Sequence, residues 1–208
     1  LRPLVKGNSP GQRPDRRPAA LLVLGFSLSA VSLYAAVWAT GTWLFGGEPA
    51  RTSMWLVAGG ILILLLALDV LRAQAGCTLG PSWRRQTPKR YMDQHAPTSA
   101  AFAWGLDTGL VFTTFRVTSL SWAALAITAL GLVPWWIGVT YALGFSVPLL
   151  IATLAVPIRT DPTGETDPEP VWLVQRLFAC TTALRVSALC MLGLASSSCI
   201  AMVVLRAG

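Results

Sequence analysis

Two long apolar stretches near the start of the chain constrain its fold more than any other feature. Residues 19–45 and 53–72 are almost entirely hydrophobic, and the short polar segment at residues 46–52 joins them. A helix that crosses about 30 Å of hydrocarbon needs roughly 20 apolar residues at about 1.5 Å per residue, and each stretch reaches that length. The pattern therefore predicts a transmembrane helical hairpin.

The composition of the whole chain agrees with a membrane environment. Of the 208 residues, 54% are hydrophobic and only 12% are charged, which leaves little polar material for the surface of a soluble domain. Three further apolar stretches follow the hairpin, at residues 99–133, 136–157 and 171–206. We expect an all-α protein, a polytopic integral membrane helical bundle of five to six transmembrane segments. It forms one domain over residues 19–206, after a flexible basic tail at residues 1–18.

The net charge of +7 reflects membrane topology and does not indicate a nucleic-acid partner. Basic residues lie before the first stretch and after the second, whereas the segment between them has only Arg51 beside Glu48. Because cytoplasmic loops are enriched in lysine and arginine, we predict a multi-pass protein of the cell membrane with a cytoplasmic N-terminus. The 14 arginines against 2 lysines indicate a GC-rich bacterial source. Three tryptophans are expected near the outer interface: Trp38, Trp43 and Trp55.

A secretory signal peptide is the alternative interpretation of the first stretch, because Arg16 and Arg17 precede it as a charged leader would. The apolar core of a signal peptide has about 7 to 15 residues and is followed by a cleavage site between small residues. The stretch at residues 19–45 is longer, and no clear site of that kind follows it. These features favour a retained membrane span.

The polar segment at residues 73–98 combines basic and aromatic side chains. It either anchors to anionic lipid headgroups or docks a cytoplasmic partner, and both interpretations stay open. The residues that would make either contact are Trp83, Arg84, Arg85, Lys89 and Arg90.

The stretch at residues 99–133 is too long for one upright helix and barely long enough for two spans. Two glycines, an acid, three threonines and an arginine interrupt it, so we predict a broken helix near residues 105–118. Irregular backbone at membrane depth requires surrounding protein or a water-filled cavity. Asp107 and Arg116, with Thr113 and Thr114, are therefore candidates for a solute, ion or proton pathway. The alternative is a structural ion pair, or an arginine that reaches the interface.

Three segments carry a resemblance to a known family: residues 101–110, 121–125 and 141–150. They resemble the second half of the cytochrome c biogenesis transporters of the DsbD/CcdA type, in which a Gly-rich broken helix precedes a Tyr-x-Leu-Gly-x-x-x-Pro helix. The resemblance implies a transporter-like fold. That family moves reducing equivalents with one cysteine in each of two broken helices, but no cysteine lies near Thr113 and Thr114 or in the first stretch. The thiol chemistry is therefore not carried over.

The cysteines and the single histidine do not form a recognisable site in the sequence. No Cys-x-x-Cys motif is present, and helical geometry places no two cysteines of the last stretch on one face. The four residues, Cys77, Cys180, Cys190 and Cys199, are expected to pack as small side chains. His95 has no partner at ligand spacing, and no common catalytic motif appears. We expect no metal, no cofactor and no enzymatic activity.

The C-terminal part begins with an acidic segment at residues 159–170, interpreted as a solvated linker because it lacks the order of an EF-hand loop. In the stretch at residues 171–206, the first part either lies at the membrane interface or extends the span within the bundle. In the second case Arg185 would face protein and pair with Asp107 or Asp69. Small residues further on permit close helix packing, within the chain or with another subunit: Gly193, Ala195, Ser196, Ser197 and Ser198.

Two classes of function fit this sequence. One is a carrier of a small solute, an ion or reducing equivalents, with its site near the broken helix. The other is a non-catalytic accessory or scaffold subunit of a larger membrane complex, or a homo-oligomer. The broken helix supports the first, and the small size with a basic loop supports the second.

Overall fold

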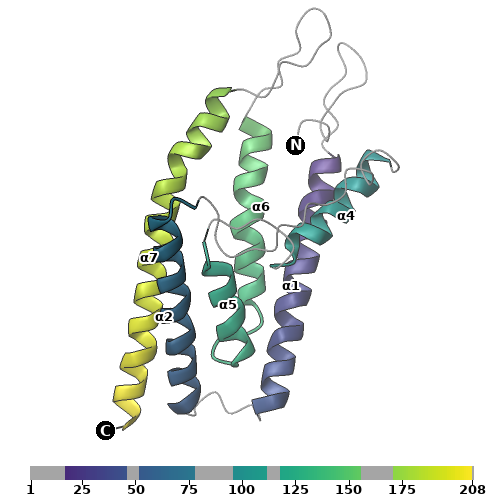
Figure 1. Ribbon diagram of the computed structural model, residues 1–208. Coiled ribbons are helices and arrows are strands. Elements are labelled where there is room, and N and C mark those ends of the chain that lie inside the picture. The colour runs from purple at the N-terminus through teal and green to yellow at the C-terminus, as the bar shows by residue number, and fades with distance from the viewer. Residues whose placement is uncertain (1–16, 46–51, 78–95, 112–117, 156–170, 208) are drawn as a thin grey trace, which may run out of the picture.

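The computed structural model describes residues 17–45, 52–77, 96–111, 118–155 and 171–207. These residues form six helices and no strand, which confirms the all-helical class. In the labels of Figure 1, the helices are α1 (Arg17–Phe45), α2 (Thr52–Gln74), α4 (Pro97–Gly109), α5 (Leu120–Ala129), α6 (Ile137–Ala155) and α7 (Val171–Ala207).

Three of these helices are long and apolar enough to cross a membrane. They are α1, α2 and the Cys180–Arg206 part of α7. The stretches expected at residues 19–45 and 53–72 agree with α1 and α2 to within two residues, whereas the membrane-length part of α7 begins nine residues after the expected start at residue 171. The three helices indicate a membrane protein. The remaining apolar helices are shorter: α5 has 10 residues, α4 has 13 and α6 has 19.

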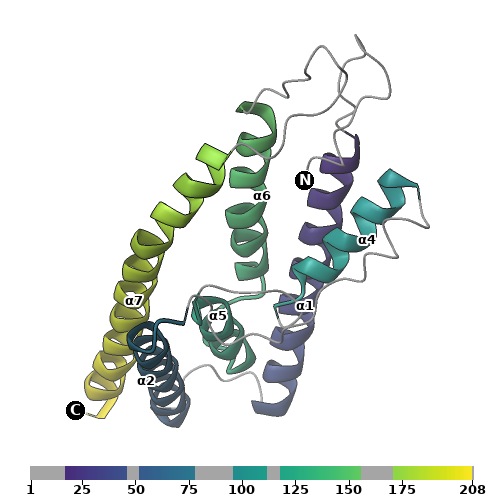
Figure 2. The same cartoon turned by 45° about the horizontal axis from the view of Figure 1, so that its top comes forward.

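The long helices run roughly along one direction, and α4 crosses α1 obliquely (Figures 1 and 2). The start of α1, the end of α6 and the start of α7 lie at one end of the molecule, and the C-terminus lies at the other. α4 approaches from the first end, and α5 continues toward the second. Helices α1, α4, α5 and α7 therefore run in one direction, and α2 and α6 run in the other.

Helix α1 is the centre of one half of the molecule, where it packs against α4, α5 and α6. Glycines bring the backbones together. A Cβ atom on Gly105 would lie 2.2 Å from the carbonyl oxygen of Leu22, and one on Gly41 would lie 2.0 Å from that of Ala129. Gly105 and Gly109 are spaced four residues apart and so face α1 together. We refer to α1, α4 and α6 as the α1 group.

Aromatic side chains fill the contact between α1 and α6. The ring of Phe26 stacks on that of Phe145 at a centroid distance of 3.8 Å, and Tyr34 lies 5.5 Å from Tyr141. Phe26 and Tyr34 are completely buried. The tilted Tyr34–Tyr141 pair has one of the arrangements that add to the packing energy of such a contact.

Helices α2 and α7 form a second unit, the α2–α7 pair. Its core contains Ala58 and Leu62 of α2 with Leu192 and Cys199 of α7, and Ala123 of α5 packs against them. The contact residues are spaced three or four positions apart along each helix, as at Ala58 and Leu62 of α2, which is the spacing of residues on one helix face. Helix α5 contacts α1, α2 and α7, so it lies between the α1 group and the α2–α7 pair.

Tryptophans collect at the end of the molecule far from Arg17. Trp43, at the end of α1, is 80% exposed, and Trp135 and Trp136, just before α6, are also exposed. The guanidinium of Arg206 lies 5.9 Å from the ring of Trp55, at the start of α2. Indole rings of this kind prefer the boundary between lipid and water, so this end has the composition of a membrane interface.

Candidate functional site

The predicted helix break lies between α4 and α5. Helix α4 ends at Gly109, Leu110 is extended (φ −71°, ψ 126°), and α5 begins at Leu120. Val111 and Ser119, on the two sides of the break, are completely buried. Three of the predicted site residues, Thr113, Thr114 and Arg116, lie outside the described residues. The described residues on both sides of the break are therefore surrounded by protein.

The gap between α4 and α5 begins at residue 110, inside the predicted range 105–118 but after its first residues. Gly105 was expected to interrupt the helix, but α4 continues through Gly105 and Asp107 to Gly109. The reason is packing: Gly105 and Gly109 lie against the backbone of α1, at Leu22 and Phe26, where no side chain would fit. Both glycines serve helix contact, and Gly105 does not break the helix, whereas Gly109 is the last residue of α4.

A carboxylate of α2 holds the start of α5. Asp69 Oδ2 accepts a hydrogen bond of 2.7 Å from the backbone N–H of Ser119, and Asp69 Oδ1 accepts one of 2.6 Å from Ser119 Oγ. Asp69 is only 9% exposed. The first backbone donors of a helix lack partners within it, and its N-terminus favours negative charge. Asp69 thus caps α5 from a neighbouring helix.

The surroundings of Asp69 are unusual for a buried carboxylate. Both of its hydrogen bonds come from neutral groups of one residue, Ser119. Helix α5 contributes no titratable side chain between Leu120 and Ala129. An ionisable residue inside a membrane span is costly and therefore marks a functional site by default. Asp69 and Ser119 thus form a short, buried polar contact at the start of α5.

Sequence reasoning missed this contact as a site. Asp69 was considered only as a partner for Arg185, and Ser119 was not considered. A weak signal was present, because Asp69 interrupts an apolar run and Ser119 directly precedes a helix, as N-cap residues do. The two residues are 50 positions apart, however, so no local pattern joins them.

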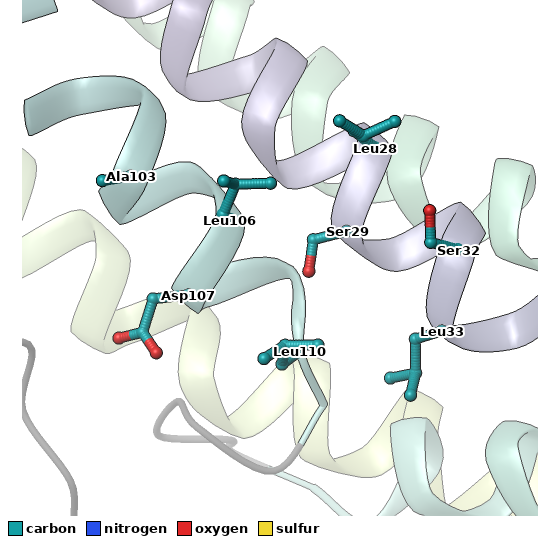
Figure 3. Close-up of a pocket in the computed structure, with 8 residues that line it drawn as sticks. All are labelled: Leu28, Ser29, Ser32, Leu33, Ala103, Leu106, Asp107 and Leu110. Atoms are coloured by element: carbon teal, nitrogen blue, oxygen red, sulfur yellow. The ribbon is translucent and has the colours of Figure 1, made fainter. Parts of the chain in front are cut away.

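Asp107 borders an open pocket of about 620 Å³ between α1 and α4 (Figure 3). Its lining is mostly apolar and comprises Leu28, Ser29, Ser32, Leu33, Ala103, Leu106, Asp107 and Leu110. The Asp107 carboxylate points away from Ser29 and Ser32. This direction follows from helix geometry, because Gly105 and Gly109 face α1 and Asp107 lies halfway between them in sequence. The pocket thus has a carboxylate at its rim and hydroxyls on its α1 side.

Arg185 binds the end of α2. Its Nη2 donates a hydrogen bond to the carbonyl oxygen of Cys77, where Gly76 (φ 69°) turns the chain out of the helix. A cation at a helix C-terminus is favourable. The expected partner Asp69 instead binds Ser119, and α4, which carries Asp107, lies on the far side of the molecule from α7 (Figures 1 and 2). The expected pairing is therefore replaced by a contact that ties α7 to α2.

The basic loop expected to dock lipid or a partner, with Trp83, Arg84, Arg85, Lys89 and Arg90, lies outside the described residues. So do His95 and the acidic segment at residues 159–170. Within the described residues, no group of three or more histidine, cysteine or acidic side chains is placed to hold a metal ion.

All four cysteines are free thiols. Cys199 is buried in the α2–α7 pair beside Gly59, whereas Cys77, Cys180 and Cys190 are exposed. The prediction that the cysteines pack as small side chains is therefore confirmed for Cys199 and is wrong for the other three. Of the small residues expected to permit close contact on α7, Ser196 is buried and Ala195 packs against the core, but Ser197 and Ser198 are exposed.

Comparison of the chain with known protein families, with curated proteins and with solved structures found no match. The class of protein is therefore defined by its own geometry. It is an all-helical protein with three helices that could cross a membrane, in which a carboxylate of one of these helices, α2, caps the start of α5.

Proposed function

We propose that this protein carries a small solute, an ion or reducing equivalents across the cell membrane, with its working site at the discontinuity between α4 and α5. The observation that supports this most is the capped start of α5, where Asp69 accepts two hydrogen bonds from Ser119. Many transporters build their sites from interrupted helices, whose exposed helix ends hold ions and charged groups within the membrane.

The lengths of the two short helices support a five-crossing topology. Helix α4 has 13 residues and α5 has 10, which correspond to about 20 Å and about 15 Å of helix. Placed end to end they span the roughly 30 Å of a bilayer core once. The five crossings of this proposal are α1, α2, α4 with α5, α6, and α7.

The orientation follows from the charges. Arg17 begins α1 after a basic tail, so the positive-inside rule places this end in the cytoplasm. The end of α6 and the start of α7 lie at the same end of the molecule (Figure 1). In this proposal the acidic segment between them is therefore cytoplasmic, and the exposed Trp43, Trp135 and Trp136 mark the outer interface.

The resemblance to the cytochrome c biogenesis transporters lies in α4, α5 and α6, at and next to the proposed site. Pro148 falls inside α6, as in the Tyr-x-Leu-Gly-x-x-x-Pro pattern of that family. The one buried cysteine, Cys199, belongs to the α2–α7 pair and not to the discontinuity. A solute or an ion is therefore the preferred cargo within this proposal, ahead of reducing equivalents.

The pocket at Asp107 suggests the chemistry of such a solute. Its lining is apolar except for Ser29, Ser32 and the carboxylate at the rim. A small amphipathic molecule with a cationic group would place its apolar part among the leucines and its charge near Asp107. The volume of this pocket lies within the usual range of small-molecule sites, and the pocket is open on one side.

A binding screen across several chemical classes of solute tests the proposal. The purified full chain would be heated in detergent with a panel of amines, amino acids, carboxylates, sugars and alkali cations. A true ligand at 100 times its dissociation constant stabilises the protein by about 2.7 kcal/mol. We expect one chemical class to raise the unfolding temperature, and we expect Asp107→Asn to remove that rise.

The matched control is Asp161→Asn, a carboxylate of the acidic segment remote in sequence from the pocket. This variant should keep the rise. Uptake of the same solute into proteoliposomes should likewise be lost in Asp107→Asn. Unchanged uptake in that variant would exclude a role for Asp107 in coupling or binding.

The second candidate is an accessory subunit, which the exposed face of α6 favours. Helix α6 packs mainly on α1, and an apolar stripe on its other side is exposed: Val139, Leu143, Val147 and Ile151. In a complex, a partner helix would cover this stripe. Deletion of Arg84 and Arg85 should then release a cytoplasmic partner if the basic loop is the dock, and retained binding would exclude that role.

A further inference from the structure

We propose that Asp69 is a proton-binding site that holds α5 to α2 when ionised and loosens this contact when protonated. The inference does not depend on the carrier function, because the same contact would act in an accessory subunit. It rests on the hydrogen bonds, burial and position of Asp69 and Ser119.

The geometry of the contact fits the ionised carboxylate. Each oxygen of Asp69 accepts one bond, from Ser119 N–H at 2.7 Å and from Ser119 Oγ at 2.6 Å. An ionised carboxylate is an acceptor at both oxygens, whereas a protonated one carries a hydrogen on one of them. Protonation would therefore weaken the N–H bond and force the Ser119 hydroxyl to turn its hydrogen to another acceptor.

Few charged side chains lie on the described helices that carry or contact Asp69. Helix α5 has no titratable group. On α7, Arg185 binds the Cys77 carbonyl, and Arg206 lies over Trp55 at the other end of the molecule. On α2, Arg72 follows three residues later, and Arg116 lies outside the described residues. The hydrogen bonds to Asp69 itself thus come from neutral groups.

The position of Asp69 gives a proton a short path. It lies five residues before the end of α2 at Gln74, which is about 8 Å along the helix. In the proposed topology this end faces the cytoplasm. A proton from that side would reach Asp69 without crossing most of the membrane.

Protonation at this point would act on the relation between the two halves of the molecule. The first turn of α5 is held by α2 through Asp69 and by α1 through Tyr34, whose hydroxyl donates to the Ser121 carbonyl at 3.4 Å. Figure 1 shows α5 between the α1 group and the α2–α7 pair. Weakening the Asp69 contact would leave the start of α5 attached mainly to the α1 group.

The test uses the full chain in nanodiscs of phosphatidylcholine and phosphatidylglycerol. Infrared difference spectra between neutral and acidic pH report the carbonyl stretch of a protonated carboxyl group. We expect a band that is absent in Asp69→Asn. In Ser119→Ala the band should remain but shift in frequency, because one hydrogen-bonding partner is lost. The control Ser198→Ala, whose exposed hydroxyl bonds only to its own helix, should match the wild type.

Hydrogen–deuterium exchange supplies the conformational readout. After correction for the intrinsic effect of pH, exchange in the first turn of α5 should rise at acidic pH in the wild type. In Asp69→Asn it should be high at both pH values. If no Asp69-dependent band appears, or if exchange in α5 is the same at both pH values in a wild-type sample that shows the band, the proposal is overturned. Should Asp69→Asn fail to fold, the frequency shift in Ser119→Ala decides, and its absence overturns the proposal as well.

Discussion

The α1 group and the α2–α7 pair solve the same packing problem in different ways. In the α1 group, glycines let backbones touch, as at Gly105 against Leu22 and Gly41 against Ala129. In the α2–α7 pair, side chains mediate the contact. A Cβ on Gly59 would lie at an ordinary 3.6 Å from Cys199, and one on Gly60 or Gly193 would meet nothing within 4 Å.

This difference has a physical meaning in lipid. Helices there gain little from burying apolar surface, because the lipid chains are equally apolar, so close packing and hydrogen bonds hold them together. Contacts between backbones cannot relax by rotating a side chain, whereas contacts between leucines can. We therefore expect the α1 group to move as a rigid unit and the α2–α7 pair to adjust more easily, with α5 between them.

The sharpest way to break the comparison is to add one methyl group to the α1–α4 contact. Gly105→Ala places a Cβ 2.2 Å from a backbone oxygen, and we expect a loss of about 3 kcal/mol, the upper end of the cost of overpacking. Unfolding in mixed micelles would measure it. The control Gly60→Ala meets open space and should change stability by no more than about 1 kcal/mol, in the stabilising direction. Equal stability of the two variants would contradict the backbone contact.

The opposite change tests the α2–α7 pair. Leu192 is completely buried, so Leu192→Ala should cost about 2 kcal/mol through the cavity it leaves. This is the lower end of the usual range because lipid, not water, is the alternative environment. Leu194→Ala, at a side chain that is 69% exposed, is the matched control and should have little effect. A larger loss in Leu194→Ala would mean that α7 packs on another face.

The connection between the two halves is tested at Ser119. Ser119→Ala removes the hydroxyl that donates to Asp69 at 2.6 Å, and a hydrogen bond to a charged group contributes about 1.5 kcal/mol or more. We expect a loss near that value in the same unfolding assay, with Ser198→Ala unchanged. If Ser119→Ala were as stable as the wild type, α5 would not be held by α2 through this contact.

The smallest effect is expected at Tyr34. Its hydroxyl bonds the Ser121 carbonyl at a long 3.4 Å, so Tyr34→Phe should cost about 0.5 kcal/mol, the lower end for a hydrogen bond. The ring and its packing on Tyr141 remain in this variant. A loss as large as that of Ser119→Ala would show that α5 is held to both halves equally strongly.

Hydropathy predicted the long helices well because the signal is an average over about 20 residues, so that single residues change it little. The start of α1 and the ends of α2 fall within a few residues of the expected limits. The sequence also predicted a helix break in the stretch at residues 99–133, from the length of that stretch and the polar residues within it. Its position was less accurate, because Gly105 suits a broken helix and a close helix contact equally well in the sequence, and only the neighbouring Leu22 carbonyl distinguishes them.

The candidate site was harder to predict because its contacts join distant parts of the chain. Asp69 and Ser119 are 50 residues apart, and nothing in either local pattern points to the other. The partner of Arg185 is a backbone carbonyl, at Cys77, which no side-chain pattern reveals. Asp107 was proposed as a candidate from the sequence, and in the structure it lies at the rim of a pocket beside α1.

The proteins that co-purify with this chain from its native membrane test most directly whether it is a carrier with its own site at the discontinuity. The tagged protein would be purified from its native membrane in a mild detergent, and every co-eluting protein would be identified and quantified by mass spectrometry. We predict that the chain elutes alone or as a homo-oligomer. A different protein present in fixed proportion to it would contradict the carrier function and identify the chain as an accessory subunit.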